Sequence, residues 1–282
     1  MFARVPASSA NLGPGFDTLA VALTLYVEVS LEFADGLSIM SDGCGAGRFD
    51  DERHLGVQIA SSILGHTNFA MRVTSTVPLS RGLGSSAALA VAAAAAAGAA
   101  DPLAVGARLD GHAENAAASV LGGLVVASVS PNDVVTARRL PLDDSWRFVV
   151  VVPDIELDTA DARRVLPTEV PFHDAVKNLN ALGLLIAGLA NHHEFVGAAM
   201  DDFLHQPYRT ELLPFAAPLL SVLCESGAAG SCWSGSGSTM LGLVTNDTAS
   251  SVARAATDFM HEQSIRGDVY VLDADRTGLV TR

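Results

Sequence analysis

The chain of 282 residues contains a single lysine, Lys177, and its 17 basic residues are outnumbered by 31 acidic ones. The net charge of −14 argues against nucleic acid or an anionic membrane surface as a partner, because both attract positively charged proteins. A Walker-type phosphate loop needs a lysine in the pattern G-x-x-x-x-G-K-[ST], and this chain does not contain that pattern. We therefore expect any bound phosphate to be held by local geometry.

Cysteines and long apolar runs are also scarce. Cys44, Cys224 and Cys232 form no C-x-x-C pair, and reduced thiols in a cytoplasm are the simplest interpretation. The first residues lack the basic region and apolar core of a secretory signal. The longest apolar run, residues 87–100, is shorter than the roughly 20 residues that span a bilayer. With 49% hydrophobic residues the chain can bury a full core, so we expect a cytoplasmic globular protein.

What the chain does contain is a glycine-rich loop followed by an alanine tract. Residues 78–87 read Pro-Leu-Ser-Arg-Gly-Leu-Gly-Ser-Ser-Ala, and mostly alanine follows. Gly82 and Gly84 permit positive φ and close approach of a ligand, and Ser85 or Ser86 is expected to cap the helix that the alanines form. The start of a helix attracts anions, so a phosphate is the expected ligand. The alternative is a turn before a buried helix, and a Rossmann G-x-G-x-x-G is absent.

Periodicity and turn residues predict helices alternating with short strands, which is typical of an α+β protein. The segment 37–40 is expected to return as the hairpin partner of strand 21–33. A domain boundary is expected at the charged segment that starts at Leu142. Strands are expected at residues 21–33, 37–40, 69–77, 124–129, 148–152, 240–244 and 269–272. Helices are expected at residues 51–65, 102–109, 114–120, 175–189, 195–204, 216–226 and 249–262.

Several motifs in order along the chain resemble those of the GHMP kinase superfamily, named after galacto-, homoserine, mevalonate and phosphomevalonate kinases. The glycine-rich loop resembles the nucleotide loop of that family. Five further motifs resemble its homoserine kinase branch or its third common motif: Pro-Ala-Ser-Ser-Ala-Asn-Leu-Gly-Pro-Gly-Phe-Asp at 6–17, Gly-His-Ala-Glu-Asn-Ala-Ala-Ala-Ser-Val-Leu-Gly-Gly at 111–123, Arg-Arg-Val-Leu-Pro at 163–167, His-Gln-Pro-Tyr-Arg-Thr-Glu-Leu-Leu-Pro at 205–214 and Ser-Gly-Ser-Gly-Ser-Thr at 234–239. The resemblance covers nearly the whole chain.

The resemblance implies a two-domain α+β fold with the active site between the domains. Residues 1–142 would form the N-terminal domain with the ATP loop, and residues 143–282 a C-terminal ferredoxin-like α/β sandwich. It also implies the activity: transfer of the γ-phosphate of ATP to the side-chain hydroxyl of L-homoserine, which gives O-phospho-L-homoserine for threonine synthesis. Mg²⁺ would accompany ATP, because it bridges phosphate oxygens in phosphoryl transfer.

Site residues are carried over by their position in these motifs. The resemblance assigns ATP to Pro78, Ser80, Arg81, Gly82, Leu83, Gly84, Ser85, Ser86 and Ala87. It assigns the metal to Ser86 and to an acidic residue, for which Asp110 and Asp101 are the nearby candidates and Asp110 is preferred. A solvated charge at a helix end is the alternative for Asp110. Asn115 stands where most of the superfamily has an aspartate, and an amide cannot act as a base. We expect Asn115 to orient the nucleophile, with His112 and Arg163 as the other catalytic candidates.

An amino-acid substrate presents a carboxylate, an ammonium and a hydroxyl. The planar fork of arginine suits a carboxylate, and the resemblance assigns that role to Arg163 and Arg209. It assigns the ammonium to Asp17, with Asn11 and His112 as polar contacts. The chain departs from the family pattern in Ala113-Glu114, in Ser238, which stands where proline is usual, and in Ala181, for which we suggest Lys177 as a substitute.

Three alternatives stay open at this point. The first is a kinase of the same fold for another small alcohol, and the second is a non-catalytic relative that binds a nucleotide or amino acid. The third is an alanine-rich structural or interaction protein. A small-molecule partner is expected in the first two, and a homodimer is left open.

Overall fold

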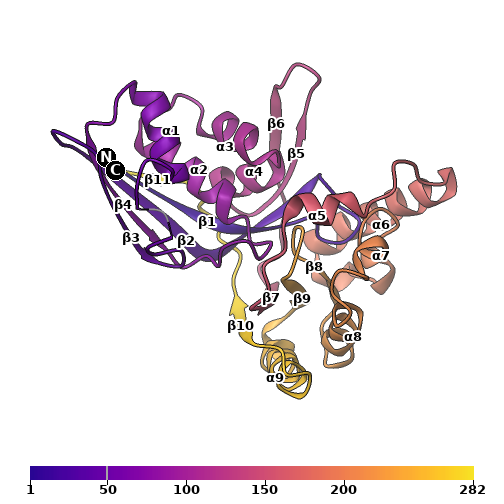
Figure 1. The fold of residues 1–282 in the computed structure, drawn as a ribbon. Coiled ribbons are helices and arrows are strands. Elements are labelled where there is room, and N and C mark those ends of the chain that lie inside the picture. The colour runs from indigo at the N-terminus through magenta and orange to yellow at the C-terminus, as the bar shows by residue number, and fades with distance from the viewer. Residues whose placement is uncertain (49) are drawn as a thin grey trace.

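The structure is a computed structural model that describes residues 1–48 and 50–282. Within these residues the chain forms one β-sheet of seven strands and a second of four, and helices cover both (Figure 1). The expected α+β class is confirmed.

The first sheet is mixed and has the strand order β11-β1-β2-β4-β3, while β5 pairs with β2 and β6 with β5. β1 and β2 are antiparallel along most of their length, with a register shift between Pro6 and Ala7. The two ends of the chain lie together because β11 pairs with β1 (Figure 1). The strands are β1 (Phe2–Ala10), β2 (Leu19–Phe33), β3 (Ser38–Gly43), β4 (Phe69–Ser75), β5 (Leu124–Val129), β6 (Val135–Leu140) and β11 (Val280–Thr281).

Four helices lie over one face of this sheet: α1 (Leu55–Leu64), α2 (Ser85–Ala96), α3 (Pro102–Asp110) and α4 (Ala113–Leu121) (Figure 1). The alanine-rich α2 is central, since it contacts β1, β2 and each of the other three helices. Methyl side chains allow this close approach from several sides. At Gly106 of α3, a Cβ atom would lie only 2.6 Å from Val91 Cγ2 of α2. The small side chains of the alanine tract therefore let α2 pack closely on all sides, and this packing fixes the position of its first turn.

The expected hairpin of residues 21–33 with 37–40 is wrong. β3 pairs in parallel with β4, with Ser38 opposite Ala70. The reason is that both edges of β2 are already used: Ser30 pairs with Phe2 of β1 on one side and with Arg72 of β4 on the other. No edge of β2 remains there for residues 38–43.

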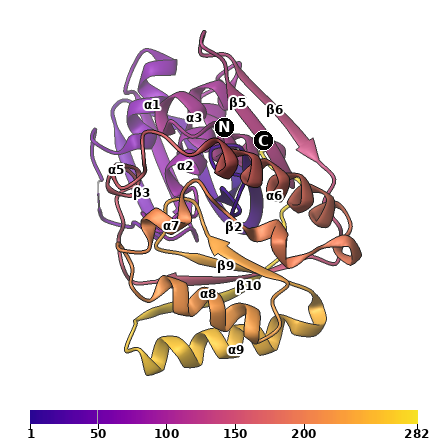
Figure 2. The ribbon, with the colours of Figure 1, turned by 90° about the vertical axis from the view of Figure 1, so that its right-hand side faces the viewer.

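The second sheet is antiparallel and has the order β10-β7-β9-β8. β7 reads as a continuous apolar run because both of its faces are buried. Phe148 and Val150 join the core of the first sheet, whereas Val149 and Val151 belong to a cluster with residues of α8 and α9. Figure 2 shows α8 and α9 below β9 and β10 of this sheet. The elements are β7 (Arg147–Pro153), β8 (Gly230–Trp233), β9 (Met240–Val244), β10 (Gly267–Leu272), α8 (Ala216–Glu225) and α9 (Asn246–Glu262).

The remaining helices are α5 (Thr159–Arg164), α6 (Phe172–Ala190), α7 (Gln206–Arg209) and two short 3-10 helices at His192–Glu194 and Gly197–Met200. The helix expected near residues 195–204 is therefore wrong. Side chains take the backbone N–H groups that such a helix would use: Asn178 accepts from Phe203, and Asp202 accepts from Leu204. The chain instead follows an irregular path toward α7.

Among the helices of residues 1–48 and 50–282, none combines the length and apolar character needed to cross a membrane. The expected boundary after residue 142 falls between β6 of the first sheet and β7 of the second. It stays a prediction, and the C-terminal β11 returns to the first sheet.

Candidate active site

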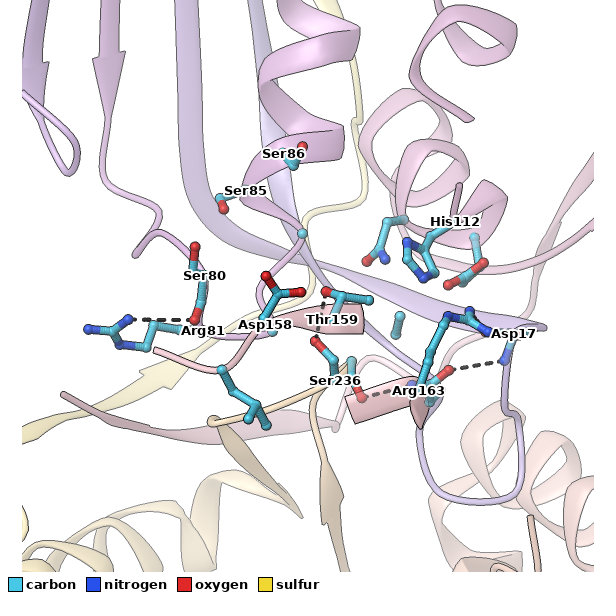
Figure 3. A pocket seen from close by; sticks show the side chains of 18 of the residues that line it. Asp17, Ser80, Arg81, Ser85, Ser86, His112, Asp158, Thr159, Arg163 and Ser236 are labelled. Carbon is cyan, nitrogen blue, oxygen red and sulfur yellow. Dashed lines mark hydrogen bonds and ion pairs between the residues drawn. The ribbon is translucent and has the colours of Figure 1, made fainter. Parts of the chain in front are cut away.

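A cavity of about 250 Å³ opens beside the start of α2. It collects side chains from β1, the glycine-rich loop, α4, α5 and the turn between β8 and β9 (Figure 3). Of the residues predicted from the sequence, those that line it are Asn11, Asp17, Ser80, Arg81, Gly82, Gly84, Ser85, Ser86, His112, Asn115, Arg163 and Arg209. Segments far apart in the sequence thus meet in one place.

The start of α2 differs from the expectation in its cap. The N-cap is Gly84, whose φ of 63° lies in the left-handed region, and no side chain caps the helix. Ser85 and Ser86 instead lie in the first turn and line the cavity (Figure 3). The first N–H groups of a helix have no partner inside it, so they form a polar, electropositive end where an anion is stabilised.

Gly82 shows why the loop needs glycine. Its φ is 77°, and a Cβ atom there would lie 2.1 Å from the carbonyl oxygen of Ser234. The Ser234 hydroxyl donates to the Gly82 carbonyl at 2.6 Å, and the Thr239 N–H donates to the Arg81 carbonyl at 3.1 Å. The glycine-rich loop and the turn at residues 234–239 are therefore packed backbone against backbone.

The Arg81 side chain points away from the other lining side chains (Figure 3). Its guanidinium donates to the Pro153 carbonyl and to the Asp154 carboxylate, each at 3.0 Å. Arg81 thus ties the glycine-rich loop to the end of β7.

The opposite end of the cavity carries an ion pair between Asp17 and Arg163 (Figure 3). Both guanidinium nitrogens of the fork donate to the carboxylate, at 2.7 and 3.1 Å, and the two side chains are 41% and 40% exposed. Asn11 connects the backbone at Asp17 to the turn at Gly235, because its Oδ1 accepts from the Asp17 N–H and its Nδ2 donates to the Gly235 carbonyl. The two groups that an amino acid would need are thus present and paired with each other.

Arg209 is the second cation at this end, and only 2% of it is exposed. It donates to the Gly235 carbonyl at 2.9 Å, to His205 Nδ1 at 3.0 Å and to the Ala162 carbonyl at 3.3 Å. Burial, together with the nearby Arg163 charge, lowers the pKa of Arg209 to about 10, so it stays charged at neutral pH.

His205 holds Arg209 in place as a neutral imidazole. Its Nε2 donates to the Gly13 carbonyl at 2.9 Å and lies 3.0 Å from the buried carboxylate of Asp202, which leaves Nδ1 to accept from Arg209. Burial lowers the pKa of His205 to about 4. The imidazole therefore stays uncharged at neutral pH and does not repel the guanidinium.

Phe16 lies inside a recognised motif but was not among the predicted site residues. Its ring stacks on His205 with 5.0 Å between centroids, and the guanidinium carbons of Arg163 and Arg209 each lie 5.6 Å from its centre. Cations over aromatic rings are stabilised by the ring quadrupole. One ring thus supports both arginines.

Other lining residues were also not predicted as site residues. Glu114 lines the cavity and is 3% exposed, and Ser236 bonds Thr159 across 3.2 Å. The residues missed are Ala10, Phe16, Glu114, Leu157, Asp158, Thr159, Gly235 and Ser236. Ser236 could have been predicted, because it belongs to the recognised motif at 234–239. No sequence pattern marks the segment 157–159, because its place beside the loop depends on the fold.

Some predicted residues do not line the cavity. Leu83 of the loop and Ala87 of α2 are buried, and the Leu83 carbonyl accepts from the Ser8 N–H. Pro78 is not part of the lining either. Lys177 pairs with Asp174 at 3.7 Å and lies over the Phe203 ring, outside the cavity lining.

For the metal, Ser86 reaches the cavity. Asp110 ends α3, but its side chain lies outside the described part of the structure. Within the described residues no group of three or more His, Cys, Asp and Glu side chains is placed to hold a metal ion. The metal assignment stays a prediction.

A second cavity of about 330 Å³ adjoins the first on the other side of the loop. The two share Ser80, Ser85 and Ser86. Much of the second wall is apolar, with Val27, Leu55, Val73, Leu79 and Leu89 among its residues. A ligand with a polar middle and an apolar, flat end could therefore lie across the loop.

Comparison with known proteins agrees with this geometry. Residues 53–130 match the family described as GHMP kinases N terminal domain, and residues 175–262 match GHMP kinases C terminal. The chain is 35% identical to the homoserine kinase of Desulfitobacterium hafniense, over 98% of this chain and 97% of that protein. It is 38% identical to the homoserine kinase of Microchaete diplosiphon, over 97% of this chain and 94% of that protein.

Solved structures show the same likeness in three dimensions. A homoserine kinase from Cytophaga hutchinsonii superposes with a TM-score of 0.85 at 28% identity, over 99% of this chain and 96% of that one. The mevalonate kinase of L. major superposes with a TM-score of 0.70 at 14% identity, over 95% and 94% of the two chains, which is a likeness of fold alone. These matches extend over both sheets and over the segments that build the cavity.

Proposed function

The chain belongs to the GHMP kinase family, and we propose that it is a homoserine kinase, which transfers the γ-phosphate of ATP to the side-chain hydroxyl of L-homoserine. The product would be O-phospho-L-homoserine, a precursor in threonine synthesis. The observation that carries the proposal is the cavity: it joins the start of α2 at one end to Asp17, Arg163 and Arg209 at the other. A helix start suited to an anion and charged side chains suited to an amino acid thus line the same cavity.

ATP would place its phosphates at the glycine-rich loop and at the start of α2. Because the chain has a single lysine and it lies outside the cavity, the negative charge would be met by main-chain N–H groups, the helix dipole and the Ser85 and Ser86 hydroxyls. The second cavity, which shares these serines and has an apolar wall, would hold the base. This arrangement is the physical case for a nucleotide over a simple phosphate.

Homoserine would bind at the opposite end, where its two charged groups would replace the ion pair between Asp17 and Arg163. In the structure, Asp17 and Arg163 neutralise each other. A zwitterion brings an ammonium for Asp17 and a carboxylate for Arg163, with the buried Arg209 beside it, so each charge gains a partner. An uncharged alcohol would have to leave this ion pair intact, and this argues for an amino acid as the substrate.

The transfer itself requires positioning more than covalent help from the protein. The homoserine hydroxyl oxygen bonds to the γ-phosphorus, the bond from that phosphorus to the β–γ bridging oxygen breaks, and ADP leaves with the electron pair. Asn115 lines the cavity but, as an amide, cannot accept the hydroxyl proton, so the proton goes to a phosphate oxygen or to solvent. His112, at the N-cap of α4, would contact the substrate from the same side (Figure 3).

Mg²⁺ would bind with ATP. The hydroxyl of Ser86 is an oxygen donor of the kind this ion prefers, and Asp110 remains the proposed acidic ligand. When bound, the ion would neutralise charge on the phosphate oxygens. Residues of this chain would bind and orient the two substrates: the loop would bind the phosphates, and Asp17 and the arginines would orient the amino acid.

The test is an assay of ADP release with Mg²⁺-ATP and L-homoserine, L-threonine, L-serine or mevalonate as acceptor. Arg163→Ala is compared with Arg164→Ala, because Arg164 is the adjacent residue of α5, pairs with Asp161 and is 75% exposed. We expect turnover with homoserine in the wild type. The kcat/KM for homoserine should fall at least a hundredfold in Arg163→Ala, mainly because KM rises, and should stay near the wild-type value in Arg164→Ala.

Two results would refute the proposed activity, and a third would refute the proposed substrate site. Turnover with mevalonate alone would indicate a kinase of this fold for another alcohol. ATP binding without turnover on any acceptor would indicate a non-catalytic relative. Equal losses in Arg163→Ala and Arg164→Ala would show that the ion pair with Asp17 is not part of the substrate site.

A further inference from the structure

Three segments meet at Ser8, a residue that the family motifs contain but that has no assigned role. Ser8 lies on β1 and is fully buried, outside the cavity lining. Its hydroxyl donates to Asn115 Oδ1 of α4 at 2.7 Å, and its main-chain N–H donates to the Leu83 carbonyl of the glycine-rich loop at 3.2 Å. The strand, the loop and the helix that carries Asn115 are thus joined through one residue.

Gly84 shows how closely this residue fits under the loop. A Cβ atom on Gly84 would lie 2.1 Å from Ser8 Oγ and 3.0 Å from Asn115 Oδ1. Because the Ser8 hydroxyl lies next to the Cα atom of Gly84, it also limits how closely the loop can approach β1 at the N-cap of α2. A larger side chain at position 8 or 84 would separate the loop from Asn115.

The hydrogen bond decides which end of the Asn115 amide faces the cavity. A carboxamide is planar and carries an acceptor oxygen on one side and a donor NH₂ group on the other. The oxygen accepts from Ser8, which is buried, while Asn115 itself lines the cavity. The NH₂ group is therefore the end that the amide turns toward the ligand.

We propose that Ser8 is a positioning residue of the kinase reaction: its hydroxyl holds Asn115 so that the amide presents an N–H donor to the transferred phosphoryl group. The proposal rests on the proposed function and deepens it, because it states what Asn115 contributes in place of a base. A fixed donor stabilises negative charge at the phosphoryl oxygens without reorienting during the reaction. Without Ser8 the amide can rotate and turn its oxygen toward the same anion, which is repulsive.

The competing explanation is that Ser8 merely fills space beneath Gly84. The chain offers a matched control in Ser9, the next residue of β1, which is equally buried and whose hydroxyl has no hydrogen-bond partner within the described residues. Ser8→Ala and Ser9→Ala remove the same atom from adjacent buried positions. Only the first removes a contact to Asn115.

The experiment measures kcat and both KM values for the wild type, Ser8→Ala, Ser9→Ala, Asn115→Ala and the double variant Ser8→Ala/Asn115→Ala. We expect kcat to fall about tenfold in Ser8→Ala, the effect of losing one buried hydrogen bond, with both KM values within about twofold of the wild type. Ser9→Ala should behave as the wild type. The double variant should match Asn115→Ala, because Ser8 acts only through that amide.

A second measurement does not depend on turnover. With selective ¹⁵N-asparagine labelling, the side-chain N–H signals of Asn115, assigned by their loss in Asn115→Ala, should shift when Mg²⁺ and a non-hydrolysable ATP analogue are added. The shift should persist in Ser9→Ala and shrink strongly in Ser8→Ala.

The outcomes separate the two proposals. An unchanged kcat in Ser8→Ala, a loss that adds in full to that of Asn115→Ala, or the same amide shift in Ser8→Ala as in the wild type would overturn the role of Ser8. If the wild type shows no homoserine-dependent ADP release, the proposed function fails, and the amide signals still decide whether Ser8 orients Asn115.

Discussion

Replacement of Gly82 by alanine tests whether the glycine-rich loop must touch the turn at residues 234–239. Gly82 has a φ of 77°, and its Cβ position lies 2.1 Å from the Ser234 carbonyl oxygen and 2.8 Å from that of Gly237. Both neighbours are backbone atoms, which cannot turn aside as a flexible side chain can. The loop or the turn must therefore shift.

Gly98 provides the matched control for the conformational part of the cost. Its φ is 80°, close to that of Gly82, but a Cβ atom there would meet nothing within 4 Å. Gly98→Ala should therefore lower the free energy of unfolding by only about 1 kcal/mol, because an alanine is strained in the left-handed region. Gly82→Ala adds overpacking of about 1–3 kcal/mol, so we expect a loss of about 2–4 kcal/mol in the free energy of unfolding.

The two variants should also differ in nucleotide binding. A displaced loop moves the start of α2 and the Ser85 and Ser86 hydroxyls away from the proposed phosphate site, so KM for ATP should rise at least tenfold in Gly82→Ala. Gly98 lies beyond the other end of α2, and Gly98→Ala should leave KM for ATP within twofold of the wild type. Urea unfolding followed by circular dichroism and steady-state kinetics measure the two effects.

The reasoning is refuted if Gly82→Ala loses no more unfolding free energy than Gly98→Ala and keeps the wild-type KM for ATP. Such a result would mean that the turn at residues 234–239 adapts without cost, so that contact between the two backbones does not define the loop.

Three further predictions concern the charged groups. Asp17→Asn removes the proposed partner of the substrate ammonium, so KM for homoserine should rise about tenfold in steady-state assays. The melting temperature should change little, because the pair with Arg163 is exposed. His205→Asn should make the free energy of unfolding less sensitive to acid. The pKa of His205 is about 4 in the folded protein, which is below its unfolded value, so the unfolded chain takes up the proton first as the pH falls. The stability that the neutral His205 contributes is therefore complete above about pH 6.5 and is lost toward pH 4. Urea unfolding at pH 7 and 4.5 should show that the wild type loses about 2–3 kcal/mol more than the variant does. Arg81→Ala frees the loop from Pro153 and Asp154 and should raise KM for ATP severalfold, with the kinetics at saturating ATP showing an unchanged KM for homoserine.

Local patterns predicted the elements that carry their own signal. The alternation in β2, the apolar run of β7 and the alanines of α2 are periodicities of the chain itself, and each element was found close to the expected residues. The failures at residues 37–40 and 195–204 arose where pairing or side-chain contacts from distant residues decided the outcome. β4 had already taken the edge of β2, and Asn178 accepts the N–H of Phe203.

The candidate site divides in the same way. Motifs identified Asn11, Asp17, Arg163 and Arg209, which the fold brings to one cavity, but no motif indicated that Asp17 and Arg163 would pair with each other. The segment 157–159 has no pattern of its own, and it reaches the wall because β7 ends beside the loop.

By itself, the amino-acid sequence predicted the kind of chemistry. A glycine-rich loop before an alanine helix and a single lysine indicate an anion held by local geometry, and motifs that resemble the GHMP kinases mark two arginines and an aspartate for an amino acid. These properties depend on residue type and spacing along the chain. Only the tertiary structure decided that Gly84 caps α2, that Arg81 turns away to Asp154, and that Ser8 bonds Asn115. The contacts of Arg81 with Asp154 and of Ser8 with Asn115 join residues 73 and 107 positions apart, and their geometry exists only once the two sheets have packed together.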